Sequence, residues 1–416
     1  MIIEGRQRPV STTHAELFDS TRSDEYVEIL ADLRHNDPLF FFEGDSYRTW
    51  VVTRYDDIKA LLKDERLIQP SLEPRIASFT DEQRAQLQPL QDFARDNLGR
   101  TRERKHALRE ATKPFFMPAS VDRLRGRVRE IIEVLLKQVD PTGPVDLVGS
   151  FSFPMPAWVL AEILGVPRED QGRFIDWSEA LIRYFRSYTF DEFVATQPKV
   201  VEMLDYCAEH IERRAGAETF GDDLVDVFAR LLAEGQFEIG ELSSSCATFL
   251  MAGHENTSHF IGNLLETLYA HRDVLESVKR DFDMLPRVMN ETMRFHGVVP
   301  FVTREVLEDM DFAGHRFERG QLVSLSLFSA NRDEGQFGDV DRFDPDNRAA
   351  RHHLGFGHGE EYCRGAHLAL METRELIEFM LTRFPDMEPV EGGMETRCQP
   401  MLRRYVTRFD VMLNAG

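Results

Sequence analysis

One of the four cysteines of the chain lies in a segment that lets the backbone come close to a flat ligand. Gly355, Gly357 and Gly359 precede Cys363, and Gly365 follows it. Glycine permits tight turns and leaves room for a ligand against the backbone. A helical pattern of apolar residues begins directly after Cys363, so its sulfur should lie at a helix N-terminus, where backbone N–H groups stabilise a thiolate. The alternative is a buried, inert cysteine beside an ordinary turn.

A thiolate held in this way is a strong axial ligand for haem iron. The order of residues is Phe-Gly-x-Gly-x-x-x-Cys-x-Gly, followed by Ala-x-Leu-Ala. This order resembles the haem-binding signature of the cytochrome P-450 family. The resemblance implies that the cofactor is haem b (iron protoporphyrin IX) and that Cys363 ligates its iron. It also implies that Phe356 packs near the sulfur and that Gly365 belongs to the haem-binding segment.

A second segment, AGHENTS at residues 252–258, lies inside a long helical pattern. It resembles the family's oxygen-binding helix, Ala/Gly-Gly-x-Asp/Glu-Thr-Thr/Ser, with matches at Ala252, Gly253, Glu255 and Thr257. The chemistry needs a glycine where the helix faces the iron, so that dioxygen has room, and a local break in the helical hydrogen bonds. Glu255 is the expected acid that supplies protons through water.

Asn256 departs from the family pattern, which usually has threonine at this position. An amide can hydrogen-bond to bound oxygen species or to the substrate, but it does not replace a hydroxyl. Thr257 lies about 100° further around the helix and should not simply take over the role. Either Asn256 and water organise proton delivery, or a polar group of the substrate does so. The predicted catalytic residues are therefore Glu255, Asn256 and Thr257.

The two propionates of a haem need cations, and the resemblance implies where these lie. Alignment on Pro114–Pro118 puts Lys105 and Arg109 at the positions of the family's His-x-x-x-Arg. A slip of one residue would replace Lys105 by His106, and Lys105 could also be an ordinary surface lysine. Arg304 matches the family's arginine on a strand.

Glu361 occupies the loop position at which the family has His or Arg, and its charge has the wrong sign for a propionate. Either it turns to solvent or it pairs with a base such as Arg364. Glu291 and Arg294 match the family's Glu-x-x-Arg, and Phe343-Asp-Pro-Asp346 resembles the segment that precedes the haem loop. We interpret Glu291 and Arg294 as a structural ion pair, because i and i+3 share one face of a helix.

These residues require a mainly helical frame with a few strands. Aromatic and β-branched residues predict a strand pair with a turn at 43–46, and a helix should begin near Asp56. The predicted helices are Val121–Val139, Leu224–Ala233 and Ile239–His271. The predicted strands are Leu39–Phe42, Tyr47–Arg54, Phe301–Val306, Asp311–Phe317, Leu322–Phe328 and Arg403–Leu413. No repeat or long linker interrupts the chain, so we expect a single domain over residues 1–416 with the mainly-α cytochrome P-450 fold and small β-sheets.

The composition indicates which kinds of molecule the protein is expected to bind. A formal net charge of −22 argues against nucleic-acid binding. No apolar run reaches the roughly 18 residues of a membrane span, and residues 1–10 do not resemble a signal peptide, so we expect a cytoplasmic protein without a membrane anchor. The basic stretch at 100–109 is either a solvated helix start or a docking site for an acidic electron donor, such as a ferredoxin or flavodoxin.

The resemblance implies monooxygenation, in which one atom of O2 enters an organic substrate and the other leaves as water. The apolar residues expected around the substrate favour a small or medium, largely apolar molecule. These contacts are expected from the loop at 68–98, the helices at 170–205, Thr248, Met251, Ala252 and Val298–Val302, including Phe79, Val299 and Phe301. The alternatives are a haem-thiolate enzyme that does not insert oxygen and a haem-based sensor or carrier. Glu255 favours the oxygenase, because a carrier needs no proton-delivering acid.

Overall fold

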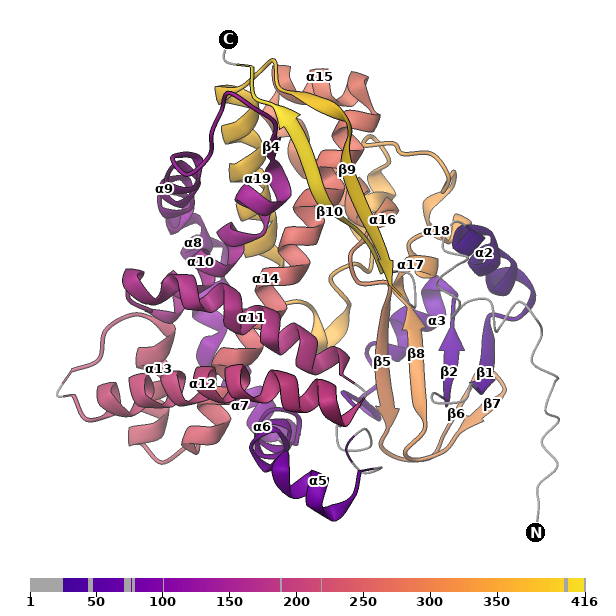
Figure 1. Cartoon of the computed structure of the whole chain (residues 1–416). Helices are drawn as coiled ribbons and strands as arrows, with labels where there is room; N and C mark the ends of the chain where they lie inside the picture. Colours follow the sequence, from indigo (N-terminus) through magenta and orange to yellow (C-terminus); the bar gives the residue numbers. More distant parts are fainter. Residues whose placement is uncertain are drawn as a thin grey trace. The chain divides into compact units, whose positions relative to one another are not determined.

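The computed structural model describes residues 25–43, 48–70, 76, 79–99, 101–187, 189–217, 219–399 and 403–414 (Figure 1). The chain divides into two compact units that alternate along the sequence. Unit 1 comprises Met1–Pro70, Asn263–Cys363 and Glu395–Thr407, and unit 2 comprises Ser71–Gly262, Arg364–Met394 and Arg408–Gly416. Residues 1–10, the expected turn at 44–46, and Arg100 lie outside the described residues.

Unit 1 is built on a five-stranded sheet with the strand order β1-β2-β8-β5-β3. Its strands are β1 (Leu39–Glu43), β2 (Arg48–Val52), β3 (Leu67–Ile68), β5 (Phe301–Val306) and β8 (Leu322–Ser326). Only β2 and β8 run parallel among these pairs; the others are antiparallel. A two-stranded hairpin of β6 (Met310–Phe312) and β7 (His315–Phe317) follows β5.

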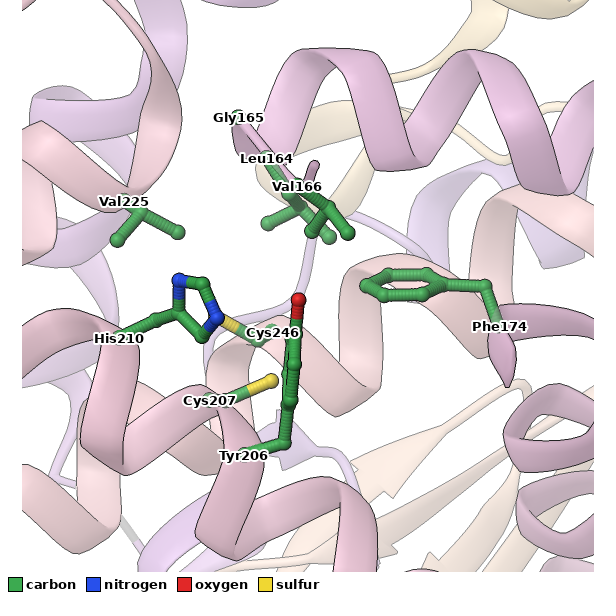
Figure 2. Close-up of a pocket in the computed structure, with 9 residues that line it drawn as sticks. All are labelled: Leu164, Gly165, Val166, Phe174, Tyr206, Cys207, His210, Val225 and Cys246. Carbon is green, nitrogen blue, oxygen red and sulfur yellow. The ribbon is translucent and has the colours of Figure 1, made fainter. Parts of the chain in front are cut away.

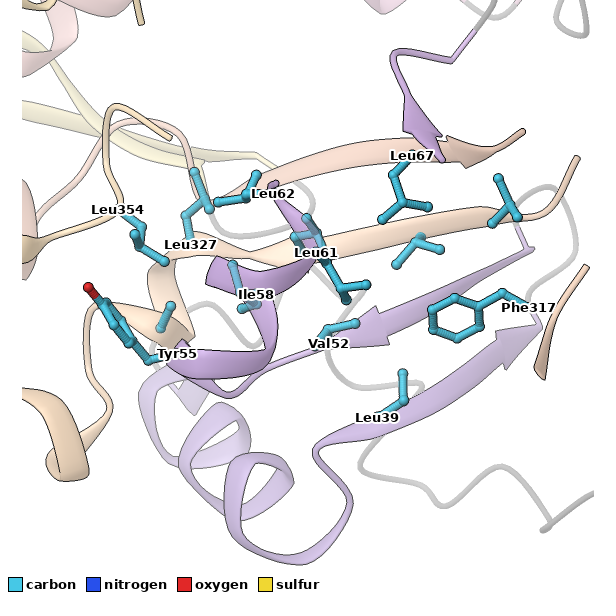
Figure 3. Packing of buried hydrophobic residues seen from close by; sticks show 14 of the residues in the cluster. Leu39, Val52, Tyr55, Ile58, Leu61, Leu62, Leu67, Phe317, Leu327 and Leu354 are labelled. Atoms are coloured by element: carbon cyan, nitrogen blue, oxygen red, sulfur yellow. The ribbon is translucent and has the colours of Figure 1, made fainter. Parts of the chain in front are cut away.

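One face of this sheet packs against helix α3 (Tyr55–Leu61), as Figure 3 shows. Val52 of the sheet and Ile58 of the helix are fully buried in this cluster. Leu354, which lies at the start of the glycine-rich segment, belongs to the same cluster. The core of unit 1 therefore holds one end of the segment that carries Cys363. The other helices of unit 1 are α2 (Tyr26–Asn36), α15 (Arg272–Arg280), α16 (Leu285–Phe295), α17 (Leu327–Ala330) and α18 (Glu334–Phe337).

Unit 2 is mainly helical, and its helices pack in the pairs α9·α10, α10·α11, α11·α12, α12·α13 and α9·α19. Most of α10 is buried, in agreement with its apolar sequence. The helices are α5 (Asp81–Gln86), α6 (Gln88–Leu98), α7 (Arg102–Thr112), α8 (Pro118–Arg123), α9 (Arg125–Leu136), α10 (Pro154–Leu164), α11 (Gln171–Arg186), α12 (Phe190–Ala215), α13 (Leu224–Ala233), α14 (Ile239–Ala270) and α19 (Ala366–Arg383). The last turns of α14 belong to unit 1. A further sheet has the order β4-β10-β9, with β4 (Val145–Asp146), β9 (Glu388–Gln399) and β10 (Arg403–Met412).

The mainly-α class with small sheets is confirmed, and β5 and α13 have the predicted bounds. Four predictions of element boundaries were wrong. The predicted strand Tyr47–Arg54 ends at Val52. The predicted helix Val121–Val139 is two helices, α8 and α9, that end at Leu136. The predicted strand Asp311–Phe317 is the hairpin of β6 and β7, because Ala313 and Gly314 turn the chain at φ of 48° and 81°. The predicted strand Leu322–Phe328 ends at Ser326, whose hydroxyl accepts a hydrogen bond from the Ser329 N–H and starts α17.

Candidate active site

The loop before α19 is closed by a backbone hydrogen bond from the Cys363 N–H to the Phe356 carbonyl, with an N···O distance of 2.8 Å. Gly357 and Gly359 have φ of 73° and 76°, which disfavours other residues. A Cβ atom at Gly359 would also lie 3.0 Å from the Leu62 carbonyl oxygen. Cys363 itself is exposed. The glycines thus fold the loop so that Phe356 and Cys363 are neighbours and the cysteine stays accessible.

The same loop is attached to Asn331, at the end of α17, and packs against α16, both within unit 1. The Leu354 N–H donates to Asn331 Oδ1 at 2.7 Å. A Cβ atom at Gly355 would lie 2.5 Å from Met293 Cγ, so only glycine allows this close approach to α16. The position of the cysteine loop therefore depends on α16 and on the segment around Asn331.

Glu291 and Arg294 form a fully buried ion pair on α16, with both side chains 0 % exposed. Arg294 Nε and Nη2 donate to the two Glu291 carboxylate oxygens at 2.7 and 2.6 Å. Its remaining donors reach the backbone carbonyls of Asn331, Val340 and Arg342 at 3.1–3.3 Å. The pair thus ties α16 to the chain that leads into the cysteine loop, which agrees with the structural role that we predicted.

The helix expected after the cysteine is α19, and it begins at Ala366. Gly365 is its N-cap, and the Gly365 carbonyl accepts from the Ala369 N–H at 2.9 Å. Gly365 has an ordinary φ of −82°, so its backbone does not require glycine. A Cβ atom there would meet nothing within 4 Å among the described residues. The space over Gly365 is thus compatible with a flat group that lies against the start of α19.

Helix α14 carries the AGHENTS segment without interruption, so the expected break in its hydrogen bonds is not seen. Instead, Asn256 Nδ2 donates to the Ala252 carbonyl, one turn earlier, at 3.3 Å. A Cβ atom at Gly253 would lie 2.8 Å from Leu160 Cδ1 of α10. A side chain at position 253 would force Leu160 to shift, so Gly253 allows the close packing of α14 against α10, which is a different reason from the room for dioxygen that the sequence suggested.

One face of α14 is left partly uncovered by the described residues. Ala252 is exposed, while Thr248 and Asn256, each four residues away, are half-buried. Residues at this spacing share one face of a helix. Thr248 Oγ1 lies 2.9 Å from Asn97 Oδ1 of α6. Thr257 is buried and lies about 100° away from Asn256, so its hydroxyl does not join the face of Ala252 and Asn256.

Glu255 is buried and forms an ion pair with Arg186, the last residue of α11. Its Oε1 also lies 4.0 Å from His259 Nε2, one turn further along α14. The sequence analysis missed Arg186, because 69 residues separate the two partners and no local pattern relates them. The expected proton-delivering acid is thus held by a cation that comes from a neighbouring helix.

Helix α7 places the candidate propionate-binding cations. Lys105 and Arg109 are half-buried and, at a spacing of four, share one face, whereas His106 is exposed. Arg104, from the same basic stretch, forms an ion pair with Glu241 of α14, with an Nε···Oε1 distance of 2.7 Å. Part of the stretch therefore stabilises the fold.

Arg304 on β5 has an unusual environment for a cation. Its Nη1 donates to the Thr303 carbonyl at 3.0 Å. Burial lowers the pKa of Arg304, and the negative charge of Glu361 raises it. Glu361 is exposed, which agrees with the first of its two predicted alternatives. Arg364 donates to Thr112 Oγ1 instead.

The residues within each unit fit a haem-thiolate. Unit 1 supplies an accessible sulfur and, in Arg304, a half-buried guanidinium that suits an anionic propionate. Unit 2 supplies the open positions at Ala252 and Gly365. Among the described residues no cluster of three side chains could hold a bare metal ion. A haem needs only one protein ligand here, because the porphyrin supplies four nitrogens.

Comparison with known proteins decides the family. The family model described as "Cytochrome P450" matches residues 159–402, more than half of the chain. The chain belongs to the cytochrome P450 family. This P450 is 30% identical to a cytochrome P450 of Bacillus subtilis over 90% of its own length and 91% of the relative's. It is also 30% identical to the 6-deoxyerythronolide B hydroxylase of Saccharopolyspora erythraea, covering 90% of this chain and 92% of that one.

Solved structures agree with this assignment. The myxobacterial cytochrome P450 CYP267B1, solved in complex with myristic acid, superposes with a TM-score of 0.80 at 31% identity, covering 96% of this chain and 99% of that one. The P450 described here is thus a haem-thiolate monooxygenase that uses O2, an organic substrate and electrons from a redox partner. This favours the oxygenase over the sensor or carrier and over the enzyme that does not insert oxygen. None of the helices in the described ranges has the length and apolar character needed to cross a membrane.

Two other cysteines of this P450 line a small pocket within unit 2, shown in Figure 2. Cys207 lies on α12 and Cys246 on α14, and both are buried. A hydrogen bond with Cys207, together with burial, raises the pKa of the Cys246 thiol. Cys246 therefore stays a neutral thiol, unlike the accessible Cys363. The pocket is lined by Leu164, Gly165, Val166, Phe174, Tyr206, Cys207, His210, Val225 and Cys246.

Proposed function

We propose that Cys363 is the thiolate ligand of haem b in this monooxygenase and that residues 1–416 act as one catalytic domain. The observation that carries the proposal is the exposed Cys363, fixed by its hydrogen bond to the Phe356 carbonyl just before α19. Phe356 then packs beside the sulfur, and Gly365 leaves space for the porphyrin. Lys105, Arg109 and Arg304 hold the propionates. The cytoplasmic location of the protein stays a prediction from the sequence.

The bound haem supplies the activation of dioxygen in the overall reaction RH + O2 + 2 e⁻ + 2 H⁺ → ROH + H2O. The chain itself must deliver the two protons and exclude bulk water. Glu255 is buried and paired with Arg186, so its carboxylate is held in one place next to the open face of α14. We assign to Glu255 the transfer of protons through water, since a positioned carboxylate contributes roughly 10²–10⁴-fold to such a transfer.

Asn256 is proposed to orient the water that carries these protons, with Ala252 shaping the space beside it, while Gly253 allows the close packing of α14 against α10. Its half-buried amide lies on the same face as Ala252, which supports this role for Asn256, whereas the buried Thr257 does not share that face. The competing possibility is that a polar group of the substrate orients the water. Replacing Asn256 by threonine and by alanine separates the two. If the protein supplies the group, alanine lowers the yield of product per electron and threonine restores it; equal yields would favour the substrate.

The electron donor is proposed to be a ferredoxin or flavodoxin that docks through cations of α7. Arg102 is exposed at the start of this helix. Contact between an acidic donor and exposed cations is screened by salt. Reduction by a ferredoxin should slow by about tenfold between low and high ionic strength. Arg102→Gln should slow it at low salt, whereas Arg183→Gln on α11 should not. No salt dependence would contradict electrostatic docking.

The substrate is proposed to be small or medium-sized and largely apolar. Phe79 lies in ring contact with Phe190 and Phe193 in unit 2, which provides an apolar aromatic wall. Met251 and, in unit 1, Val299 are half-buried. Because a similar P450 was solved with myristic acid, this fatty acid is the first substrate to test. With labelled dioxygen, a reductase and a ferredoxin, the product should carry one labelled oxygen atom. NADPH consumption without any oxygenated product from a panel of apolar molecules would contradict the substrate class.

A further inference from the structure

His254 on α14 is fully buried and bonded at both ring nitrogens. Its Nε2 lies 2.6 Å from the Phe153 carbonyl oxygen, at the start of α10. Its Nδ1 lies 2.7 Å from the hydroxyl of Ser178 on α11, which is also fully buried. The imidazole packs against the Phe153 ring at a centroid distance of 4.4 Å. One side chain of α14 therefore connects this helix to two others.

The partners determine which nitrogen carries the proton. A carbonyl oxygen can only accept, so Nε2–H must donate to Phe153. In the neutral ring Nδ1 accepts, and the Ser178 hydroxyl donates to it. Burial lowers the pKa of His254 to about 4, so the ring is neutral at physiological pH. A neutral ring with one donor and one acceptor bond has a single orientation in this site.

The next residue on α14 is Glu255, and its partner Arg186 lies on the same helix, α11, as Ser178. Ser178 and Arg186 are eight residues apart, which corresponds to about 12 Å along α11. Helix α11 is thus attached to α14 through two adjacent residues. A rotation of α14 by about 20° would move its Cα atoms by nearly 1 Å, and the carboxylate of Glu255 by more.

We propose that His254 is a positioning residue for proton delivery, because its bonds to Phe153 and Ser178 fix the rotation of α14 and so the place of the Glu255 carboxylate. The inference rests on the proposed role of Glu255. A misplacement of about 1 Å at a reacting group can cost on the order of 100-fold in rate. A substitution that loosens the attachment of α14 should therefore impair proton delivery without unfolding the helix.

The products of oxygen reduction report on proton delivery without any organic substrate. Electrons from NADPH through a ferredoxin give either water, O2 + 4 e⁻ + 4 H⁺ → 2 H2O, or hydrogen peroxide, O2 + 2 e⁻ + 2 H⁺ → H2O2. Poor proton delivery by the chain would increase the peroxide share. The measurement is peroxide formed per NADPH consumed, for the wild type and for Ser178→Ala, His254→Gln and Glu255→Gln. Ser245→Ala is the matched control, because among the described residues this buried hydroxyl of α14 bonds only to the Glu241 carbonyl of its own helix.

We expect Ser178→Ala to raise the ratio of peroxide to water by about threefold and His254→Gln by about tenfold, with the control unchanged. The glutamine can still donate to the Phe153 carbonyl, so His254→Gln should fold. In a Glu255→Gln background, Ser178→Ala should have no further effect on the ratio, because the residue acts through Glu255. Ring ¹⁵N NMR should find His254 as the neutral Nε2–H form from pH 5 to 9.

The possible failures are distinguishable. A wild-type ratio that Glu255→Gln does not change, or a wild type that already gives only peroxide, would overturn the role of Glu255. A large effect of Glu255→Gln, with Ser178→Ala and His254→Gln behaving like the control, would overturn the positioning role alone. A charged His254 at pH 6, or an undiminished effect of Ser178→Ala in the Glu255→Gln background, would also contradict it.

Discussion

Replacing Glu291 by glutamine removes one charge from the buried ion pair while keeping the shape of the side chain. Glu291 Oε1 accepts from Arg294 Nη2 at 2.6 Å and from the Asp344 N–H at 2.9 Å, and Oε2 accepts from Arg294 Nε at 2.7 Å. In the glutamine one of these acceptors becomes an NH2 donor that faces other donors. At least one buried hydrogen bond is lost, and the guanidinium keeps no carboxylate partner among the described residues.

The expected loss of stability follows from this geometry. Removing one partner of a buried ion pair destabilises proteins by about 3–5 kcal/mol. Three backbone carbonyls still accept from Arg294, so we expect the lower end, about 3 kcal/mol. The matched control is Glu276→Gln, since Glu276 pairs with Lys279 at the same i,i+3 spacing but is 55 % exposed. An exposed pair of this kind contributes about 0.5 kcal/mol or less.

Urea unfolding followed by far-UV circular dichroism measures both changes, and the haem absorption measures retention of the cofactor. The Asn331 carbonyl accepts from Arg294, and the Asn331 amide oxygen accepts from the Leu354 N–H of the cysteine loop. Glu291→Gln should therefore lose haem at a lower urea concentration than Glu276→Gln. If the two variants unfold and release haem alike, the reasoning about the buried pair is refuted.

Three further predictions concern pH, packing and the propionates. Burial holds the pKa of His254 at about 4, so the unfolded chain, with a histidine pKa of about 6.5, binds the proton first. The contribution of neutral His254 to the free energy of unfolding is complete above about pH 6.5 and falls towards pH 4 by about 1.4 kcal/mol per pH unit. His254→Gln should therefore flatten the dependence of the urea midpoint on pH. Equal slopes for the wild type and the variant between about pH 4 and 6.5 would contradict this. Gly253→Ala should lower the free energy of unfolding by about 1–3 kcal/mol through overpacking against Leu160, and a second substitution, Leu160→Val, should restore part of this loss. An unchanged melting temperature of Gly253→Ala would show that Leu160 shifts without a cost in stability. Arg304→Gln should speed haem transfer to apomyoglobin by at least about tenfold, whereas Arg316→Gln, at an exposed position on β7, should not. Equal rates of haem transfer would contradict the assignment of Arg304 to the propionates.

The elements that could be predicted from the sequence are those with strong local signals. Strand β5 at Phe301–Val306 and helix α13 at Leu224–Ala233 have the predicted bounds, because each is a short run with one clear periodicity. The glycines before Cys363 likewise indicated a tight loop, and Gly357 and Gly359 do have positive φ. Local conformation of this kind depends mainly on the residues themselves.

The contacts that the sequence could not predict join distant segments. Glu255 was recognised as an acid, but its partner Arg186 comes from another helix. Gly253 was recognised as necessary, but the reason lies in Leu160 of α10. His254 was passed over, because nothing in the sequence indicates that it would meet Ser178. Packing between helices decides these cases, and one sequence does not specify it.

The most direct test of the central claim is the absorption spectrum of the purified protein after reduction with dithionite and exposure to carbon monoxide. A haem whose iron is ligated by the Cys363 thiolate should give a strongly red-shifted Soret band. Cys363→Ala should abolish that band, and Cys246→Ala, which removes a buried neutral thiol, should leave it in place. A wild-type protein supplied with ample haem that shows no such band, or a band that survives Cys363→Ala, would contradict the assignment of Cys363 as the ligand.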